Sequence, residues 1–166
     1  MAELDRVWSE MLGAAGERAA AEGRQHLADY LRLRATNDAI RTQGVKWLFA
    51  TVIEHAAEAQ RTRNITIERE DPYSFRRGNS TMVGSALFIR NGVRCLTVDA
   101  GWARTPSHGI MQKGALAYAR LSHFGMPRSN TELRLVFEDS LPNWRDEKDH
   151  PADADLLKAH VDLLLA

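Results

Sequence analysis

The first part of the chain places apolar side chains at helical intervals. From Leu4 to Ala15 the apolar positions follow the pattern i, i+3, i+4, i+7, which predicts an amphipathic helix. Gly13 and Gly16 weaken this helix, because each costs up to about 1 kcal/mol relative to alanine. A break between these two glycines is therefore expected.

Two further helical segments follow. The first covers residues 17–34 and is expected to bend at Gly23. The second is expected to begin at Asn37 or Asp38, which are good N-cap residues, and to run to about Arg61. Its apolar residues cover more than one face, so a wide buried face is predicted. Together the three segments indicate helical hairpins.

The hydrophobic period then changes to that of a strand. Ile65 and Ile67 alternate with polar residues, which is typical of a half-buried strand. Residues 71–80 are polar and contain turn formers, and we interpret them as a loop. Leucine and phenylalanine alternate with other residues over 133–137, which predicts a later strand.

Asn91-Gly92 is the strongest local signal in the chain. It lies between two β-rich runs, 82–90 and 93–102. Asn-Gly favours a two-residue type I′ turn, because both turn residues take positive φ. This turn places Leu87 opposite Leu96 and assigns both to one face of the hairpin.

The remaining pattern predicts a helix over 110–124 and a final helix opened by Pro151 or Asp153. Helices and strands are partly segregated, which favours an α+β fold. We expect N-terminal helices packed on a small antiparallel sheet centred on the hairpin, a helix between the last strands, and a C-terminal helix. The whole chain is expected to be a single domain, with a helical part over 1–62 and a mixed part over 63–166. The expected core contains Leu48, Val52, Leu87, Leu96, Val98, Tyr118, Leu135 and Phe137.

Composition narrows the class of protein. The chain has 166 residues, of which 44% are hydrophobic and 27% are charged, and this excludes wholesale disorder. No apolar run reaches the roughly 18 residues of a membrane span, and the N-terminus lacks the pattern of a signal peptide. Cys95 is the single cysteine. A soluble cytoplasmic domain is expected.

Charge is balanced overall but unevenly distributed. There are 22 basic and 22 acidic residues. Residues 61–120 carry 10 basic and 4 acidic groups, whereas 138–166 carry 3 and 8. The two regions could attract each other within the fold, or the basic one could form a binding face. Neutrality and the acidic tail count against a nucleic-acid partner.

The segment after the hairpin is the candidate binding site. It follows a strand and opens an expected helix, whose first N–H groups are free to bind an anion. Arg104 and Lys113 add positive charge, and Trp102 offers a flat apolar wall. The alternative is plain capping of the helix by Ser107. The candidate ligand-binding residues are Trp102, Arg104, Ser107, His108, Lys113, Arg76 and Arg77.

Two functions follow from these residues. The leading hypothesis is non-catalytic binding of a small polar or anionic ligand, or of a protein partner. The alternative is a small enzyme in which His108 is the general acid or base and Asp99 orients it, since imidazole titrates near neutral pH. Asp99 is expected opposite Gly84, beside open space. No nucleotide-binding loop, cofactor motif or metal-ligand spacing is present.

Two apolar stripes bear on association. The segment from Leu4 to Ala15 and the final leucine-rich helix are both large for a chain of this size. Uncovered apolar stripes usually become interfaces. A homodimer is therefore expected.

Overall fold

The computed structural model describes residues 2–109, 111 and 114–166 of the chain. They form a mixed α+β fold with N-terminal helices and a C-terminal helix, as predicted. The elements in chain order are α1 (Ala2–Ala21), α2 (Gln25–Gln60), β1 (Ile65–Arg77), β2 (Ser80–Asn91), β3 (Arg94–Trp102), β4 (Ala117–His123), β5 (Thr131–Glu138), β6 (Leu141–Arg145) and α3 (Ala154–Leu165).

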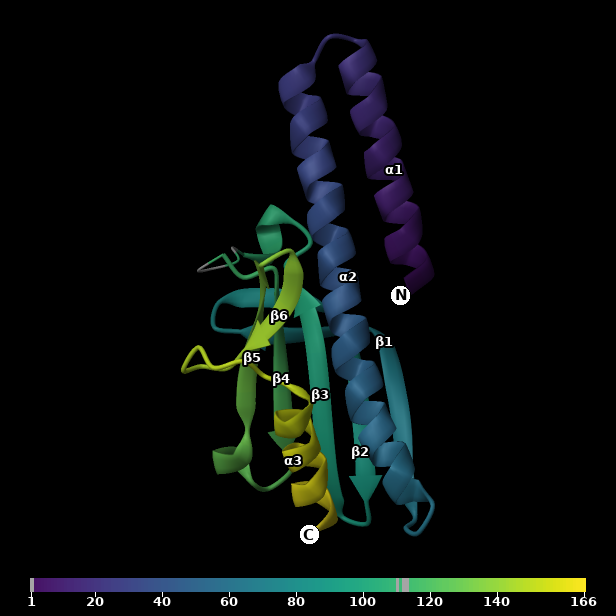
Figure 1. Ribbon diagram of the computed structural model, residues 1–166, viewed down its shortest axis with the longest axis vertical. Coiled ribbons are helices and arrows are strands. Elements are labelled where there is room, and N and C mark those ends of the chain that lie inside the picture. The colour runs from purple at the N-terminus through teal and green to yellow at the C-terminus, as the bar shows by residue number, and fades with distance from the viewer. Residues whose placement is uncertain (1, 110, 112–113) are drawn as a thin grey trace.

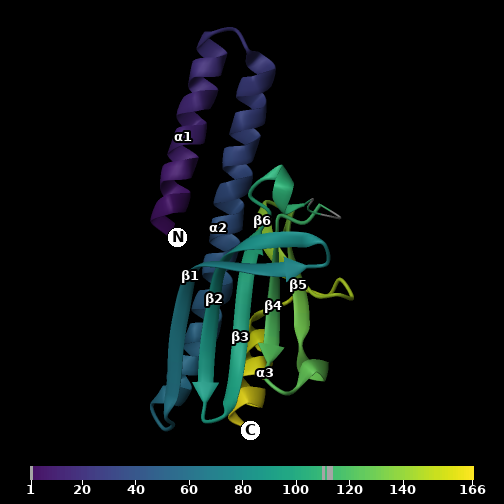
Figure 2. The same ribbon diagram turned by 180° about the vertical axis from the view of Figure 1, so that it is seen from behind.

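The six strands form one antiparallel sheet in the order β1-β2-β3-β4-β5-β6. The second half of α2 and the helix α3 cover one face of this sheet (Figure 1). The far end of the β1–β2 hairpin crosses the opposite face (Figure 2). A bulge between Glu70 and Tyr73 interrupts the pairing of β1 with β2, and bulges of this kind bend a strand. The expected loop over 71–80 is therefore wrong, because these residues belong to the strands of the bent hairpin except for the turn at Gly78 and Asn79.

The N-terminal helices are two rather than three. The chain reverses at Gly23, which has a φ of 76°, and α2 then continues without a break to Gln60. The expected break between Gly13 and Gly16 is absent. There α1 lies beside α2 and buries Leu12, so packing offsets the low helix propensity of glycine. The upper half of this helical hairpin projects beyond the sheet (Figure 1).

The turn of the central hairpin lies one position later than predicted, and this shifts the pairing of the two strands by two residues. Asn91 pairs with Arg94, and Gly92, with a φ of 63°, is the first turn residue. Leu87 consequently lies opposite Val98 rather than Leu96. A shift of two residues preserves which face each side chain occupies, so the predicted assignment of faces is confirmed.

The expected helix over 110–124 is wrong for the described residues, because Ala117–His123 forms β4. Among the described residues on either side of β4, the helical segments are short 3-10 turns at Pro106–His108 and Pro127–Ser129. In β4 the residues facing α2 include Ala117 and Ala119, both buried. Alanine is small and has high helix propensity, so it gives little of the apolar alternation that marks a strand.

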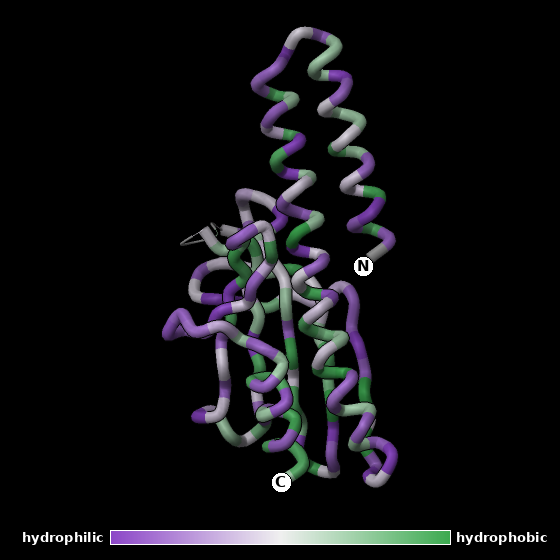
Figure 3. The backbone as a smooth tube through the Cα atoms, viewed as in Figure 1, coloured by the Kyte–Doolittle hydropathy of each residue, from purple (hydrophilic) through white to green (hydrophobic). Residues whose placement is uncertain are grey.

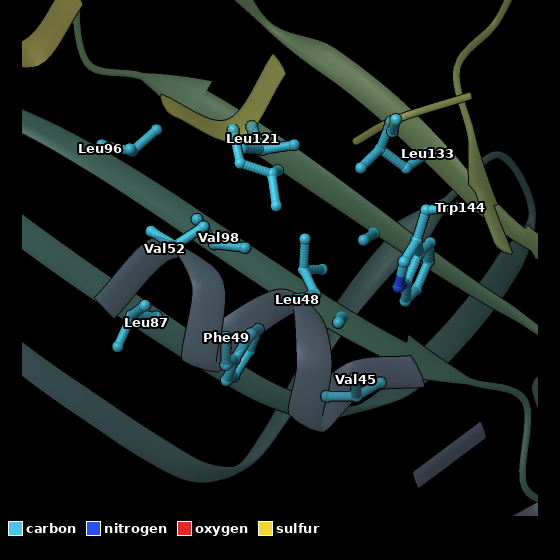
Figure 4. Packing of buried hydrophobic residues seen from close by; sticks show 14 of the residues in the cluster. Val45, Leu48, Phe49, Val52, Leu87, Leu96, Val98, Leu121, Leu133 and Trp144 are labelled. Atoms are coloured by element: carbon cyan, nitrogen blue, oxygen red, sulfur yellow. The ribbon is translucent and has the colours of Figure 1, made fainter. Parts of the chain in front are cut away.

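The core lies between α2, α3 and the sheet. Leu48, Phe49 and Val52 of α2 pack over the middle strands (Figure 4). At Gly44 the helix comes so close to the sheet that an added Cβ would lie 2.6 Å from Leu135 Cδ2. Trp144 Nε1 donates a hydrogen bond to the Gly44 carbonyl oxygen at 2.9 Å, which fixes this approach.

The predicted core is correct with one exception. Phe137 is 49% exposed, because it lies opposite Pro142 near the connection from β5 to β6. The other expected core residues are buried. They are Leu48, Val52, Leu87, Leu96, Val98, Tyr118 and Leu135.

The apolar stripes of the first and the last helix differ in how far they are covered. The final helix begins as predicted, with Asp153 Oδ1 accepting the N–H of Leu156 at 3.1 Å. Its residues Leu157, Val161 and Leu164 are buried, and the helix packs against α2 and β3. The stripe of α1 keeps exposed apolar side chains, including Leu4 and Met11. Apolar residues continue along the projecting hairpin in Figure 3. None of the helices within the described residues has the length and apolar content needed to cross a membrane.

Candidate functional site

A cleft of about 490 Å³ lies between the two N-terminal helices and the segment that follows β3. We call it the α1–α2 cleft. The helix α1 contributes Leu4, Asp5 and Trp8, and α2 contributes six residues between Tyr30 and Arg41. The remaining wall is the segment from Trp102 to Thr105. The cleft thus joins parts of the chain that are about 100 positions apart.

Two polar contacts hold α1 against the rest of the cleft. Asp5 Oδ1 lies 3.0 Å from Arg104 Nη1. Trp8 Nε1 donates a hydrogen bond to Asp38 Oδ2 at 3.1 Å. Asp38 is buried inside α2, where the sequence had suggested a helix start. Its carboxylate serves as an anchor for Trp8 rather than as a cap.

Arg104 is the central cation of the cleft. Its Nε donates to the carbonyl oxygen of Val83 at 3.2 Å, and its guanidinium lies 3.6 Å from the centroid of the Trp102 ring. Cation–π stacking and the carbonyl together fix the plane of the guanidinium. Its Nη2 atom is buried and has no hydrogen-bond partner among the described residues.

The charges on the cleft walls favour an anion. Arg34 Nη2 donates to the Arg104 carbonyl oxygen at 3.2 Å, and Arg41 Nη1 donates to Asp38 Oδ1 at 2.8 Å. Three guanidinium groups, from Arg34, Arg41 and Arg104, therefore line the cleft with the carboxylates of Asp5 and Asp38. The lining keeps one net positive charge, and it sits among aromatic side chains.

A second cavity, of about 290 Å³, adjoins the first. Both are lined by Asp5, Trp102 and Arg104. The second cavity adds Lys46 and Arg69 to the positive side chains nearby. Within the described part of the chain, no ion pair involves Lys46.

The structure places the predicted site residues in several locations. Trp102 and Arg104 line the α1–α2 cleft. Ser107 Oγ lies 2.8 Å from Thr105 Oγ1, and His108 Nδ1 accepts the backbone N–H of Arg104 at 3.2 Å. Both lie just beyond the lining residues of the cleft. Lys113 lies outside the described residues.

Arg76 and Arg77 belong to the bent β1–β2 hairpin on the opposite face of the sheet. Arg77 lies 3.7 Å from the centroid of the Tyr118 ring and 4.0 Å from Glu132 Oε2. The structure does not bring these arginines into the α1–α2 cleft. Arg77 packs the hairpin against β4 and β5 instead, and Arg76 is exposed.

Asp99 and His108 have separate partners. Asp99 is 1% exposed, lies opposite Ala86, and its Oδ2 accepts from Arg120 at 2.8 Å. Burial raises the pKa of the Asp99 carboxyl above its ordinary value, while the bond to Arg120 opposes that change. Among the described residues no hydrogen bond joins Asp99 to His108, which binds the backbone of Arg104.

A buried histidine pair lies elsewhere in the fold. His123 Nε2, at the end of β4, is 2.8 Å from His160 Nδ1 of α3, and His160 Nε2 is 3.1 Å from Thr131 Oγ1. Burial lowers the pKa of His123, and burial together with His123 lowers the pKa of His160 to about 4. Both rings are therefore neutral near pH 7 and join α3 to the sheet. Within the described residues, no group of three or more His, Cys, Asp or Glu side chains is placed to hold a metal ion.

Sequence reasoning missed most of the cleft. Asp5, Trp8, Arg34, Asp38 and Arg41 lie on helices whose mutual packing no local pattern specifies. The sequence contains one weak indication of these cleft residues. Charged residues interrupt the apolar stripes at Asp5 and Asp38, and a charge inside an apolar stripe needs a partner once it is buried.

No protein-family model, curated protein or solved structure matches this chain.

Proposed function

We propose that this protein binds a small anionic molecule with an aromatic or apolar part in the α1–α2 cleft, without catalysing a reaction. The arrangement of Arg104 over Trp102, with a buried guanidinium nitrogen free of hydrogen bonds among the described residues, carries the proposal. The cleft volume of about 490 Å³ lies within the range of small-molecule sites. A cytoplasmic location, which suits a chain with one free cysteine, belongs to the same proposal.

The composition of the lining supports both parts of such a ligand. Arginine binds carboxylate and phosphate groups through paired N–H donors. Trp8, Tyr30 and Leu33 form an apolar mouth that water reaches in the free protein. A ligand that covers these side chains gains from their removal from water. The enzyme alternative has no comparable support, since Asp99 and His108 are bound to different partners.

A pair of dyes tests this proposal. Anilinonaphthalene sulfonate is anionic and becomes fluorescent in apolar sites, and phenylnaphthylamine is the same molecule without the sulfonate. We expect the anionic dye to bind the native protein, and Arg34→Gln to weaken its binding about fivefold through the loss of one cation. Phenylnaphthylamine binding should change less.

Arg32→Gln is the matched control. Arg32 lies on the same helix, is largely exposed and faces Asp29 rather than the cleft. Its replacement removes the same charge and should leave anionic-dye binding unchanged. Equal weakening by both variants would show that the dye responds to net charge and not to the cleft.

Self-association is a second candidate function. The exposed side chains of Leu4, Met11, Tyr30 and Leu33 favour it, because Leu4 and Leu33 are 64% and 61% exposed and apolar faces of this kind commonly become interfaces. A homodimer formed through the helical hairpin would cover them. Light scattering tests it, since a mass of 18.6 kDa at micromolar concentration would identify a monomer.

A further inference from the structure

We infer that the Asp5 carboxylate occupies the position on Arg104 at which the anionic group of the ligand binds. A bound anion then displaces Asp5 together with the first turns of α1. This inference rests on the proposed function, because it assumes that the α1–α2 cleft binds an anion. It adds the class of ligand group, a carboxylate or a similar planar or tetrahedral anion. It also adds an internal competitor that regulates the site.

The contacts around Arg104 preorganise its guanidinium group to bind an anion. The Val83 carbonyl and the Trp102 ring hold the guanidinium in place without using its outer edge. Asp5 uses one nitrogen of that edge, Nη1, at 3.0 Å. The other, Nη2, is buried without a partner in the described residues. An anion with two oxygens in one plane can use both nitrogens, so it gains a hydrogen bond that Asp5 does not make.

Asp5 also stands where the two cavities meet. Together with Trp102 and Arg104 it lines both the cavity of about 490 Å³ and that of about 290 Å³. The ion pair between Asp5 and Arg104 therefore separates the two cavities. Withdrawal of Asp5 would join the cavities and expose the Arg104 edge to a ligand that extends to either side.

The segment that carries Asp5 is lightly held. Its apolar neighbours Leu4 and Val7 are exposed, whereas the buried contacts of α1 with α2, at Leu12 and Ala19, come later in the helix. Figure 2 shows α1 lying beside α2 and apart from the strands. Within the described residues, the other polar contacts that the start of α1 makes with the rest of the fold are the hydrogen bond from Trp8 to Asp38 and the Arg34 guanidinium, which lies 5.4 Å from the centroid of the Trp8 ring. Displacement of the first turns therefore costs few buried contacts.

Asp5→Asn tests the inference with the same two dyes. Removal of the competing charge should tighten the binding of anilinonaphthalene sulfonate about fivefold, because the dye no longer breaks an ion pair to reach Arg104. The binding of uncharged phenylnaphthylamine should change by less than about twofold, since it does not use the guanidinium edge. Glu10→Gln is the matched control, because Glu10 is an exposed acid on the same helix that pairs with Arg6. It should leave both affinities unchanged.

Hydrogen exchange on the unmodified protein gives a second measurement. Addition of the anionic dye should speed amide exchange in the first turns of α1, whereas phenylnaphthylamine should not. This readout detects displacement of the helix, which an attraction between charges alone would not produce.

The outcomes separate this inference from the proposed function. Tighter anionic-dye binding by Asp5→Asn with faster exchange in α1 supports the inference. Dye binding by the native protein that Asp5→Asn leaves equal or weaker, or slower exchange in α1, overturns the inference and leaves the proposed function standing. If neither the native protein nor Asp5→Asn binds the anionic dye, the inference and the proposed function are both overturned.

Discussion

The stability of this protein should fall between pH 6.5 and 4 because of the buried histidine pair. Burial lowers the pKa of His160 from 6.5 to about 4, and the neighbouring His123 adds to the effect. Above pH 6.5 the imidazole is neutral in the folded and unfolded chains, so it does not affect the free energy of unfolding. As the pH falls towards 4, the unfolded chain binds a proton that the folded chain does not.

The size of this loss follows from the two pKa values. A pKa of about 4 against 6.5, at about 1.4 kcal/mol for each pH unit, amounts to about 3 kcal/mol. The loss levels off as the pH falls through the pKa of the folded state, because below it both the folded and the unfolded chains bind the proton. Burial also lowers the pKa of His123, so His123 contributes with the same sign.

Urea denaturation of the native protein and of His160→Gln at intervals from pH 6.5 to 4 measures the effect. The free energy of unfolding of the variant should fall less steeply with decreasing pH, because the contribution of His160 is missing. This holds whatever the stability of the variant at neutral pH. Asp99 contributes with the opposite sign, because its raised pKa makes the folded chain bind a proton more readily. That contribution is common to both proteins and cancels in the comparison.

His26→Gln serves as the control. His26 is exposed near the start of α2 and lies far along the chain from α3. Its replacement should leave the pH profile as it is in the native protein. A full slope in His160→Gln, or an equal flattening in both variants, would show that His160 is not the source of the pH dependence.

Three substitutions test the packing, each by the free energy of unfolding in urea. Leu96→Ala should cost about 2–5 kcal/mol, since Leu96 is fully buried between the sheet and the helices; no measurable loss would place it outside the core. Gly84→Ala should cost about 3 kcal/mol or more, because the new Cβ would lie 1.9 Å from the Ala100 carbonyl oxygen. Gly13→Ala should instead stabilise the protein by up to about 1 kcal/mol, since its Cβ would meet no atom within 4 Å, and a loss there would contradict the helical geometry of α1.

Strands with strong alternation were predictable from the sequence, and the alanine-rich strand was not. In β2 and β3 large apolar residues such as Leu87 and Val98 alternate with others, and their faces were predicted correctly even though the strand pairing shifted by two residues. In β4 the buried residues of the main core include the small side chains of Ala117 and Ala119. The local pattern there is equally compatible with a helix, and only the tertiary packing decides.

The candidate cleft was predictable only on one side. Trp102 and Arg104 stand at the end of a recognisable strand, so local reasoning found them. Their partners depend on how α1 returns along α2, which is set by contacts such as that of Trp8 with Asp38. Asp38 illustrates the difficulty, because the residues around it do not show whether it begins a helix or lies buried within one.

The strand order has a consequence for how the chain folds. Each strand pairs with the next one along the chain, so the sheet can grow through short loops that close rapidly. The contact between Asp5 and Arg104 spans 99 positions and closes a much longer loop, at a larger entropic cost. We therefore expect the sheet to assemble first and the first turns of α1 to dock late. A molecule with a complete sheet would then pass through a stage in which the Arg104 guanidinium is in place and no internal carboxylate yet covers it.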